Sequence, residues 1–310
     1  GGNALLKRGE PMTAEVQRAN VRKAAEALAA LAREHDIVVA HGNGPQVGLL
    51  ALQAAAYKEV APYPLDILGA ESVGMIGYLV EQELTNALPA DTKLATLLTQ
   101  IEVDRDDPAF DKPEKPIGPV YSSDEAKKAR DAHGWVMVEE GYEKWRRVVP
   151  SPLPKRIIQI ETLRLLVELG VVVVCAGGGG IPVIRDRDGN LVGMEAVIDK
   201  DRAAGLLAEE IGADAFLMLT DVEAVYADWG TSQQRAIRHV RPDQIDPANF
   251  PAGSMGPKVE AARTFASRPG RIAGIGRLED AAAILEGAAG TLVSSTAIAA
   301  MHNDPEPAPE

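Results

Sequence analysis

The chain has 310 residues, a net charge of −13 and 46% hydrophobic residues, which is typical of a globular α/β protein. The acidic balance and the low aromatic content, 4%, argue against a nucleic-acid partner. No apolar run reaches the roughly 20 residues that cross a bilayer, so we expect no membrane partner. The single cysteine, Cys175, lies in an apolar strand and is interpreted as a core residue. One cysteine also fits a reducing compartment, and we expect a cytoplasmic protein.

Short apolar runs alternate with helical patterns along most of the chain, which is typical of a mostly parallel central sheet with helices on both faces. We therefore assign the chain to the α/β class. The expected elements are helix 13–34, strand 37–40, helix 45–57, helix 74–88, strand 94–100, helix 156–169, strand 171–175, a hairpin turning at 188–190, helix 201–212, strand 216–219, helix 257–266, helix 278–285 and strand 291–293.

Residues 104–150 have a different composition from the rest. Aspartates, lysines and prolines alternate there without a long apolar run, which favours an inserted lid subdomain. Trp135, Val136 and Met137 indicate at least a small hairpin inside it. The acidic, proline-rich tail at 301–310 is expected to be disordered.

The chain has three glycine-rich loops, two of which follow apolar runs, and such loops expose bare backbone N–H groups, which suits an anion. They lie at 1–3, 42–44 and 177–180. The alternative is that each loop is only a tight turn, but two facing loops favour an anion site. Neither a P-loop nor a true GxGxxG fingerprint is present, so another architecture would hold a nucleotide.

Three lysines in loops or at helix starts would add positive charge to such a site: Lys115, Lys200 and Lys258. The structural alternative is a solvated lysine in each case, most plainly for Lys200 between two aspartates. Together with the glycine loops, the three lysines indicate an enzyme that moves a phosphoryl group. His41, beside a glycine turn, is interpreted as a neutral structural histidine.

Seven motifs occur in order along nearly the whole chain. They are GGNAL (1–5), HGNGPQVG (41–48), KPIGP (115–119), RVVPSP (147–152), AGGGG (176–180), IDKD (198–201) and GSMGPK (253–258). In this order they resemble the carbamate kinases of the amino acid kinase family. The resemblance implies a three-layer sandwich fold, a homodimer, and reversible phosphoryl transfer between carbamoyl phosphate and ADP to give ATP and carbamate. Nucleotide chemistry implies Mg²⁺ bound through phosphates and water, and no His/Cys cluster indicates another metal site.

The resemblance also implies roles for individual residues. Lys115 would be carried into the site by the lid, Lys200 would stabilise the transferring group, and Lys258 would meet the nucleotide phosphates, with Asp201 orienting the lysines. The carbamate side would consist of Gly1, Gly2, Asn3, Gly42, Asn43 and Gly44. The nucleotide side would consist of Gly178, Gly179, Thr220, Asp221, Val222, Tyr226, Met255, Gly256 and Lys258. Asp221 could equally be a helix cap.

We expect an acceptor-binding half at 1–168, which includes the lid at about 104–150, and a nucleotide-binding half at 169–300. The chain departs from the family pattern at two places. The strand expected before Gly1 is absent from the sequence, and the loop at 219–225 is more acidic than expected.

Two other functions are compatible with these motifs. The first is another kinase of the same family, acting on acetylglutamate, uridylate or an isoprenoid phosphate; the insertion with Lys115 argues against it. The second is a non-catalytic nucleotide-binding regulatory protein. The three lysines argue against this, and the missing first strand argues slightly for it.

Overall fold

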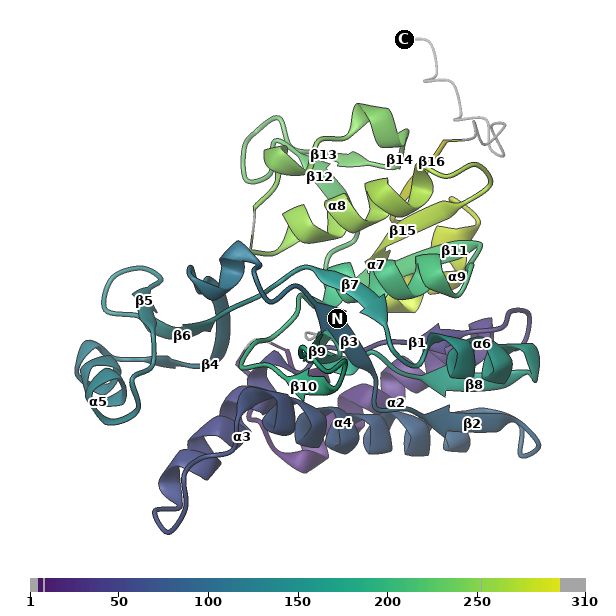
Figure 1. Cartoon of the computed structure of the whole chain (residues 1–310). Helices are drawn as coiled ribbons and strands as arrows, with labels where there is room; N and C mark the ends of the chain where they lie inside the picture. Colours follow the sequence, from purple (N-terminus) through teal and green to yellow (C-terminus); the bar gives the residue numbers. More distant parts are fainter. Residues whose placement is uncertain (1–4, 8, 252, 296–310) are drawn as a thin grey trace.

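The computed structural model describes residues 5–7, 9–251 and 253–295. It consists of two α/β halves and a smaller arm that reaches out to one side (Figure 1). Gly1, Gly2 and Asn3, predicted to bind carbamate, lie outside the described residues, as does the predicted tail at 301–310. Within the described ranges, none of the helices combines the length and apolar character that a bilayer span requires.

The first half contains two small sheets, with strand orders β1-β8-β2 and β10-β9-β3-β7. The first sheet is parallel throughout, and β3 and β9 pair in parallel in the second. The strands are β1 (Val38–Val39), β2 (Lys93–Thr96), β3 (Gln100–Val103), β7 (Pro154–Ile157), β8 (Val171–Val174), β9 (Ile181–Arg185) and β10 (Leu191–Gly193). The helices are α2 (Ala14–Leu31), α3 (Gly44–Ala56), α4 (Leu65–Ala87) and α6 (Ile160–Glu168).

Strand β8 is apolar throughout because both of its faces are covered. Val172 and Val174 pack with residues of α2 and α4 on one face. Val173 and Cys175 pack with Leu163 of α6 on the other. Alternate side chains of a strand point to opposite faces, so a strand covered twice needs an unbroken apolar run.

The second half is built on one sheet with the order β11-β15-β16-β14, in which β11 and β15 are parallel. A two-stranded hairpin, β12-β13, lies beside it (Figure 1). The strands are β11 (Ala215–Thr220), β12 (Val225–Ala227), β13 (Arg235–Ile237), β14 (His239–Val240), β15 (Ile272–Arg277) and β16 (Thr291–Ser294). The helices are α7 (Lys200–Glu210), α8 (Met255–Ala266) and α9 (Ala281–Leu285).

The arm lies within the predicted lid at 104–150. It is a three-stranded antiparallel sheet, β4 (Lys115–Tyr121), β6 (Trp145–Val149) and β5 (Met137–Glu139), with helix α5 (Ser123–His133). The expected hairpin is therefore part of a larger unit. At its base, Ile117 and Val149 pack with residues of α3 and α4, which roots the arm in the first half.

Strand pairing bears on where the two halves divide. Strands β8 and β9 follow residue 168, yet they pair with β1, β2 and β3, which precede it. A boundary near the start of α7 fits these sheets better than the predicted one at 168. The division into an acceptor half and a nucleotide half stays a prediction.

Several predicted element boundaries were wrong. Helix α4 begins at Leu65 rather than near residue 74. Its early turns were not predicted because Gly69 and Gly74 weaken the helical pattern of the sequence there. The expected strand at 94–100 is two strands, β2 and β3. The first residues of the expected helix at 156–169 instead belong to β7.

Strand β15 was not predicted, although it lies inside the second sheet. Its Gly274 and Gly276 interrupt the apolar run that would have marked it. A Cβ atom at Gly274 would lie 2.4 Å from Ile284 of α9 and 2.6 Å from Leu217 of β11. The glycine therefore permits close packing between a strand and its neighbours.

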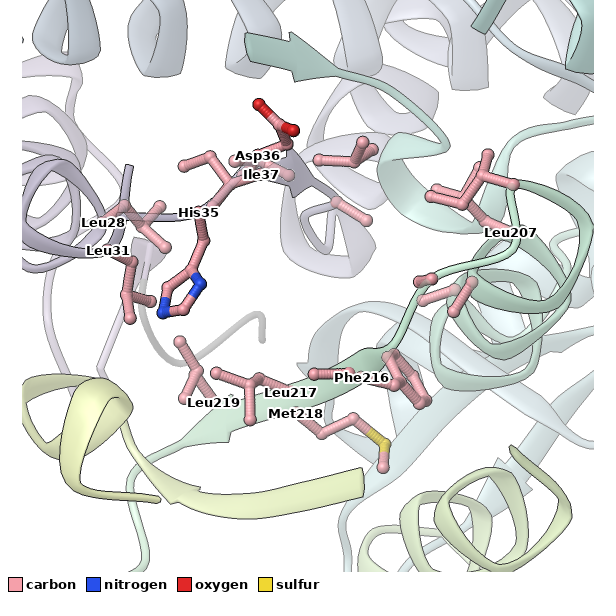
Figure 2. Close-up of a pocket in the computed structure, with 18 of the residues that line it drawn as sticks. Leu28, Leu31, His35, Asp36, Ile37, Leu207, Phe216, Leu217, Met218 and Leu219 are labelled. Atoms are coloured by element: carbon pink, nitrogen blue, oxygen red, sulfur yellow. The ribbon is translucent and has the colours of Figure 1, made fainter. Parts of the chain in front are cut away.

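A cavity of about 890 Å³ lies between the sheets of the two halves. Strands β1 and β11, each the end strand of its sheet, both line it. Figure 2 shows Leu28 and Leu31 of α2 facing Leu217 and Leu219 of β11 across this space. Lys200 and Asp201 also line the cavity, but most of its wall is aliphatic. Such a wall does not suit a phosphate group.

Candidate active site

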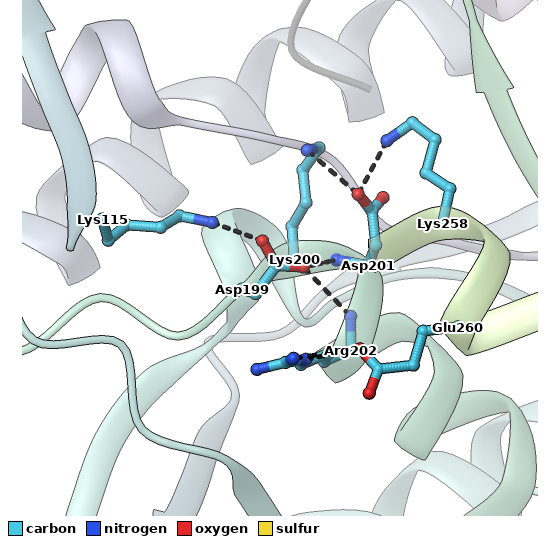
Figure 3. A network of polar contacts seen from close by, with 7 residues as sticks. All are labelled: Lys115, Asp199, Lys200, Asp201, Arg202, Lys258 and Glu260. Carbon is cyan, nitrogen blue, oxygen red and sulfur yellow. Dashed lines mark hydrogen bonds and ion pairs between the residues drawn. The ribbon is translucent and has the colours of Figure 1, made fainter. Parts of the chain in front are cut away.

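The three predicted lysines meet at one place, although they come from β4, α7 and α8 (Figure 3). The Nζ of Lys258 lies 2.7 Å from Oδ2 of Asp201, and the Nζ of Lys200 lies 3.4 Å from the same oxygen. The Nζ of Lys115 lies 2.5 Å from Oδ2 of Asp199. Ammonium groups that are distant in sequence therefore converge on two carboxylates separated by one residue.

The start of helix α7 places Lys200 and Asp201 in the cluster. Asp199 is its N-cap, and its Oδ1 accepts hydrogen bonds from the backbone N of Asp201 at 2.9 Å and of Arg202 at 3.3 Å. This capping satisfies N–H groups that lack a partner within the helix. Lys200 and Asp201 consequently occupy the first turn. The sequence had indicated Asp201 as the helix start, so the role of Asp199 as cap was missed.

Burial shapes the electrostatics of the cluster. Lys258 is only 8% exposed, and this burial lowers the pKa of its ammonium group; Asp201 opposes the effect and Lys200 adds to it. Burial would raise the pKa of Asp199, but Lys115, Lys200 and the N–H of Arg202 outweigh it and hold that pKa at about 2. Asp199 is therefore ionised at neutral pH.

Helices α7 and α8 are tied together next to the lysines. Arg202 of α7 donates from Nε and Nη2 to Oε2 of Glu260 on α8, at 3.1 and 2.9 Å. Glu260 follows Lys258 by two positions in the same helix. Figure 3 shows this ion pair below the lysine cluster, where it fixes one helix against the other.

The loop at 42–44 lies at the start of α3 and is braced from α4. Asn43, which is buried, donates from Nδ2 to Oγ of Ser72 at 2.8 Å. Ser72 in turn donates to the carbonyl of Gly69. Gly44 is the first residue of α3, so backbone N–H groups at this helix start are available for an anion.

The loop at 177–180 packs directly against this first loop. The backbone N of Gly178 donates to the carbonyl of His41 at 2.7 Å. A Cβ atom at Gly178 would lie 2.2 Å from the side chain of Asn43, and one at Gly179 would lie 2.4 Å from the carbonyl of Ile198. Both glycines have positive φ, 66° and 99°. These two residues, predicted on the nucleotide side, thus lie between the loop at 42–44 and Ile198, which precedes Asp199.

His41 is buried in this region, and its Nδ1 lies 3.1 Å from the carbonyl oxygen of Gly42. Burial lowers its pKa to about 4, although the contact with Gly42 works in the opposite direction. The ring is neutral at pH 7. The arrangement agrees with the structural role expected for this histidine.

Residues 1–274 match the amino acid kinase family. A carbamate kinase of Rhizobium meliloti is 56% identical over 298 residues, which cover 96% of this chain and 92% of that protein. This chain belongs to the amino acid kinase family, within its carbamate kinase branch.

Solved structures agree with this membership. The Giardia lamblia carbamate kinase bound to AMP-PNP matches with a TM-score of 0.86 at 36% identity, covering 95% of this chain and 96% of that one. A Giardia lamblia carbamate kinase thiocarbamoylated by disulfiram on a cysteine matches with a TM-score of 0.83 at 37% identity, with the same coverage. The predicted fold class and family are therefore confirmed.

The remaining predicted nucleotide residues of this amino acid kinase lie in the second half. Thr220 ends β11, and its Oγ1 donates to Oδ1 of Asp221 at 3.0 Å. Val222 follows in the same loop, and Tyr226 lies in β12. Met255 and Gly256 begin α8, where the N of Gly256 donates to the carbonyl of Pro251 at 2.9 Å. The residues after β11 and those at the start of α8 therefore belong to the half of the molecule that carries Lys258.

Two residues of the site region were missed from the sequence. Asp199 was noticed only as a neighbour of Lys200. Arg147 of β6 is 9% exposed, with its guanidinium 4.1 Å from the ring centroid of Trp135 and its Nη2 3.6 Å from Oε1 of Glu195. Glu195 also accepts from the backbone N of Leu65 at 2.7 Å, so it links the base of the arm to the start of α4. Arg147 begins the RVVPSP motif at 147–152, which was the available signal, but the sequence alone assigned it no role.

Proposed function

We propose that this protein acts as a carbamate kinase, catalysing reversible phosphoryl transfer between carbamoyl phosphate and ADP to give ATP and carbamate. The observation that carries the proposal is the convergence of Lys115, Lys200 and Lys258 on Asp199 and Asp201. Relatives of the carbamate kinase branch, matched over nearly the full chain, support the choice of substrate.

The reaction exchanges one P–O bond for another. The bond between phosphorus and the carbamoyl oxygen breaks, and a bond forms between phosphorus and a terminal oxygen of ADP, so carbamate leaves with its oxygen. Three ammonium groups around the migrating phosphoryl group would neutralise the charge on its oxygens. Asp201 would orient Lys200 and Lys258, because one of its oxygens contacts both.

The acceptor side would be formed by backbone N–H groups. We assign this role to Gly42, Asn43 and Gly44, at the N-terminus of α3. Gly178 packs against Asn43, and Gly179 packs against the carbonyl of Ile198. These contacts support placing both glycines nearer to the carbamate than to the nucleotide base. The same role for Gly1, Gly2 and Asn3 stays a prediction.

The nucleotide side would be formed by the loop after β11 and the start of α8, with Thr220, Asp221, Val222, Tyr226 and the segment Met255 to Lys258. The Giardia relative bound to AMP-PNP supports a nucleotide in this fold. Among the described residues, no group of three or more acidic, histidine or cysteine side chains could hold a metal, and Asp199 and Asp201 are both engaged by lysines. Mg²⁺ would therefore enter as part of MgADP, held by phosphate oxygens and water.

A homodimer and a cytoplasmic location complete the proposal. The homodimer rests on the resemblance, and the location rests on the single cysteine, which fits a reducing compartment. Light scattering of the purified protein would measure the dimer directly. A monomer mass at concentrations near 10 μM would contradict it.

The function is tested by coupling ATP formation from carbamoyl phosphate and MgADP to hexokinase and glucose-6-phosphate dehydrogenase. ATP formation that depends on both substrates is the expected result. Phosphorylation of acetylglutamate, uridylate or an isoprenoid phosphate, with no ATP from carbamoyl phosphate, would select another kinase of the family. ADP binding by calorimetry without turnover on any acceptor would select a regulatory protein.

A further inference from the structure

Asp199 uses its two carboxylate oxygens for two separate tasks. Oδ1 caps α7 through the backbone N of Asp201 and Arg202. Oδ2 contacts the ammonium group of Lys115, which is the first residue of strand β4 in the arm. One side chain therefore joins the start of the helix that carries Lys200 and Asp201 to the base of the arm.

The charges of the cluster show why this contact matters. Three ammonium groups meet two carboxylates, and Asp201 already serves Lys200 and Lys258. Asp199 is the carboxylate that contacts Lys115. Without the charge of Asp199, the three ammonium groups of Lys115, Lys200 and Lys258 would share the single carboxylate of Asp201. The side chains of both aspartates are at most 15% exposed, so water would screen this repulsion little. Like charges in such partly buried surroundings repel strongly.

Within the arm, the backbone of Lys115 is held in place, but its side chain is not. The backbone of Lys115 pairs with Val149 of β6, which sets where the strand begins. Its side chain is 24% exposed, and a lysine side chain has several freely rotating bonds. The ion pair with Asp199 is what sets the position of the ammonium group relative to α7.

We propose that Asp199 is a positioning residue for the reaction: it holds the ammonium group of Lys115 beside Lys200 and Lys258 before the substrates bind, and so couples the arm to helix α7. This inference rests on the proposed function. The phosphoryl group would then meet a cation cluster that is already assembled, and less reorganisation would be needed during transfer.

The test separates the ion pair from the helix cap. Asp199→Asn keeps a good capping residue but removes the charge, because Asn and Asp are about equally effective N-caps. We expect kcat for ATP formation to fall by about 10 to 100-fold. This is less than the roughly 10² to 10³-fold typical of removing a group that itself stabilises the developing charge, because Asp199 acts through Lys115. The Kd of ADP, measured by calorimetry, should change less than twofold, and the melting temperature should stay within about 2 °C.

Lys115→Met provides the second half of a double-mutant cycle. If Asp199 acts through Lys115, Asp199→Asn should lower kcat less than twofold in the Lys115→Met background. An equal fall in both backgrounds would overturn the inference, and so would unchanged kcat in Asp199→Asn alone. Asp246→Asn is the matched control. Asp246 also caps a short helix, accepting from the N of Ala248 at 3.0 Å, and its substitution should leave kcat unchanged.

A readout without turnover keeps this inference distinct from the proposed function. Trypsin cleavage in the arm, at exposed sites such as Lys144, should be at least threefold faster in Asp199→Asn and in Lys115→Met than in the wild type. The double variant should be cleaved no faster than either single variant, because both substitutions break the same ion pair. Wild-type protein that makes no ATP would refute the function alone. Unchanged cleavage rates in both single variants would refute the coupling of the arm to α7, whatever the activity.

Discussion

The two sides of the lysine cluster are built in different ways. On the side of α7 and α8, Lys258 is buried and packed, and the two helices are clamped by Arg202 and Glu260. On the opposite side, Lys115 stands at the base of an arm that extends away from the body (Figure 1). One side of the site is therefore set by core packing, while the other depends on a few contacts at the base of the arm.

This difference suggests a division of labour. Side chains fixed by packing can hold their geometry before any substrate arrives, which favours stabilisation of the charge that develops during transfer. A group on an arm can instead complete the site and exclude water when the arm is seated, which matters for a substrate as easily hydrolysed as carbamoyl phosphate. Substitutions on the two sides should therefore have different effects on turnover and on stability.

The largest effect is expected on the packed side, from Lys200→Ala. Its ammonium group would stabilise the transferring phosphoryl group, so kcat should fall by about 10² to 10³-fold. The Kd of ADP should change less than threefold, because Lys200 is not assigned to the nucleotide. Steady-state kinetics and calorimetry measure the two quantities. Equal losses in turnover and ADP binding would contradict the assigned role. Lys128→Ala, on an exposed face of α5, is the control.

A smaller effect is expected on the arm side, from Gly48→Ala. A Cβ atom at Gly48 of α3 would lie 1.9 Å from the Cα of Gly118 in β4, so the arm would have to shift. We expect kcat to fall by up to about 10²-fold through misplacement of Lys115. The free energy of unfolding should fall by about 1–3 kcal/mol.

The same substitution at Gly74 supplies the control for the arm, because a Cβ atom there meets nothing within 4 Å. Gly74→Ala lies in helix α4 and should be neutral or slightly stabilising. Wild-type turnover in Gly48→Ala would show that the seat of the arm does not control the position of Lys115.

The smallest effect is expected at His41, which precedes the loop at 42–44, and it is a dependence of the free energy of unfolding on pH. The pKa of His41 is lowered from 6.5 to about 4, so below pH 6.5 the unfolded chain binds a proton that the native state does not. The stability that depends on His41 is complete above pH 6.5 and is lost as the pH falls toward 4. Between pH 7 and 5 the loss should be about 2 kcal/mol.

Urea unfolding of wild type and of His41→Gln at both pH values would isolate this contribution. The wild type should lose more stability than the variant on acidification. An NMR titration of the wild type provides a second measurement that does not depend on the variant folding. A ring of His41 that titrates near pH 6.5 would contradict the assigned burial.

The sequence predicted those parts of the fold in which local pattern and burial agree. Strand β8 was recognised because both of its faces are buried and its sequence is therefore apolar throughout. The loops at 42–44 and 177–180 were recognised because clustered glycines follow apolar runs. Strand β15 was missed because Gly274 and Gly276, which make room for neighbouring side chains, also erase the strand pattern.

The site was predictable to a similar extent. The three lysines were selected through their motifs, and the structure brings them together. The part played by Asp199 was not predictable, because its contact with Lys115 joins residues 84 positions apart. The packing of Gly178 against Asn43 is likewise a tertiary contact, and no local pattern places these two loops side by side.

The single cysteine has a pharmacological consequence. Cys175 is 1% exposed, and burial raises the pKa of its thiol to about 12. Electrophilic drugs attack the thiolate form of accessible cysteines, and this chain has no other cysteine to offer them. Disulfiram thiocarbamoylates a cysteine of the Giardia carbamate kinase, but Cys175 would not offer it an accessible thiolate. Two proteins of one fold would thus differ in whether a cysteine is accessible to such a reagent.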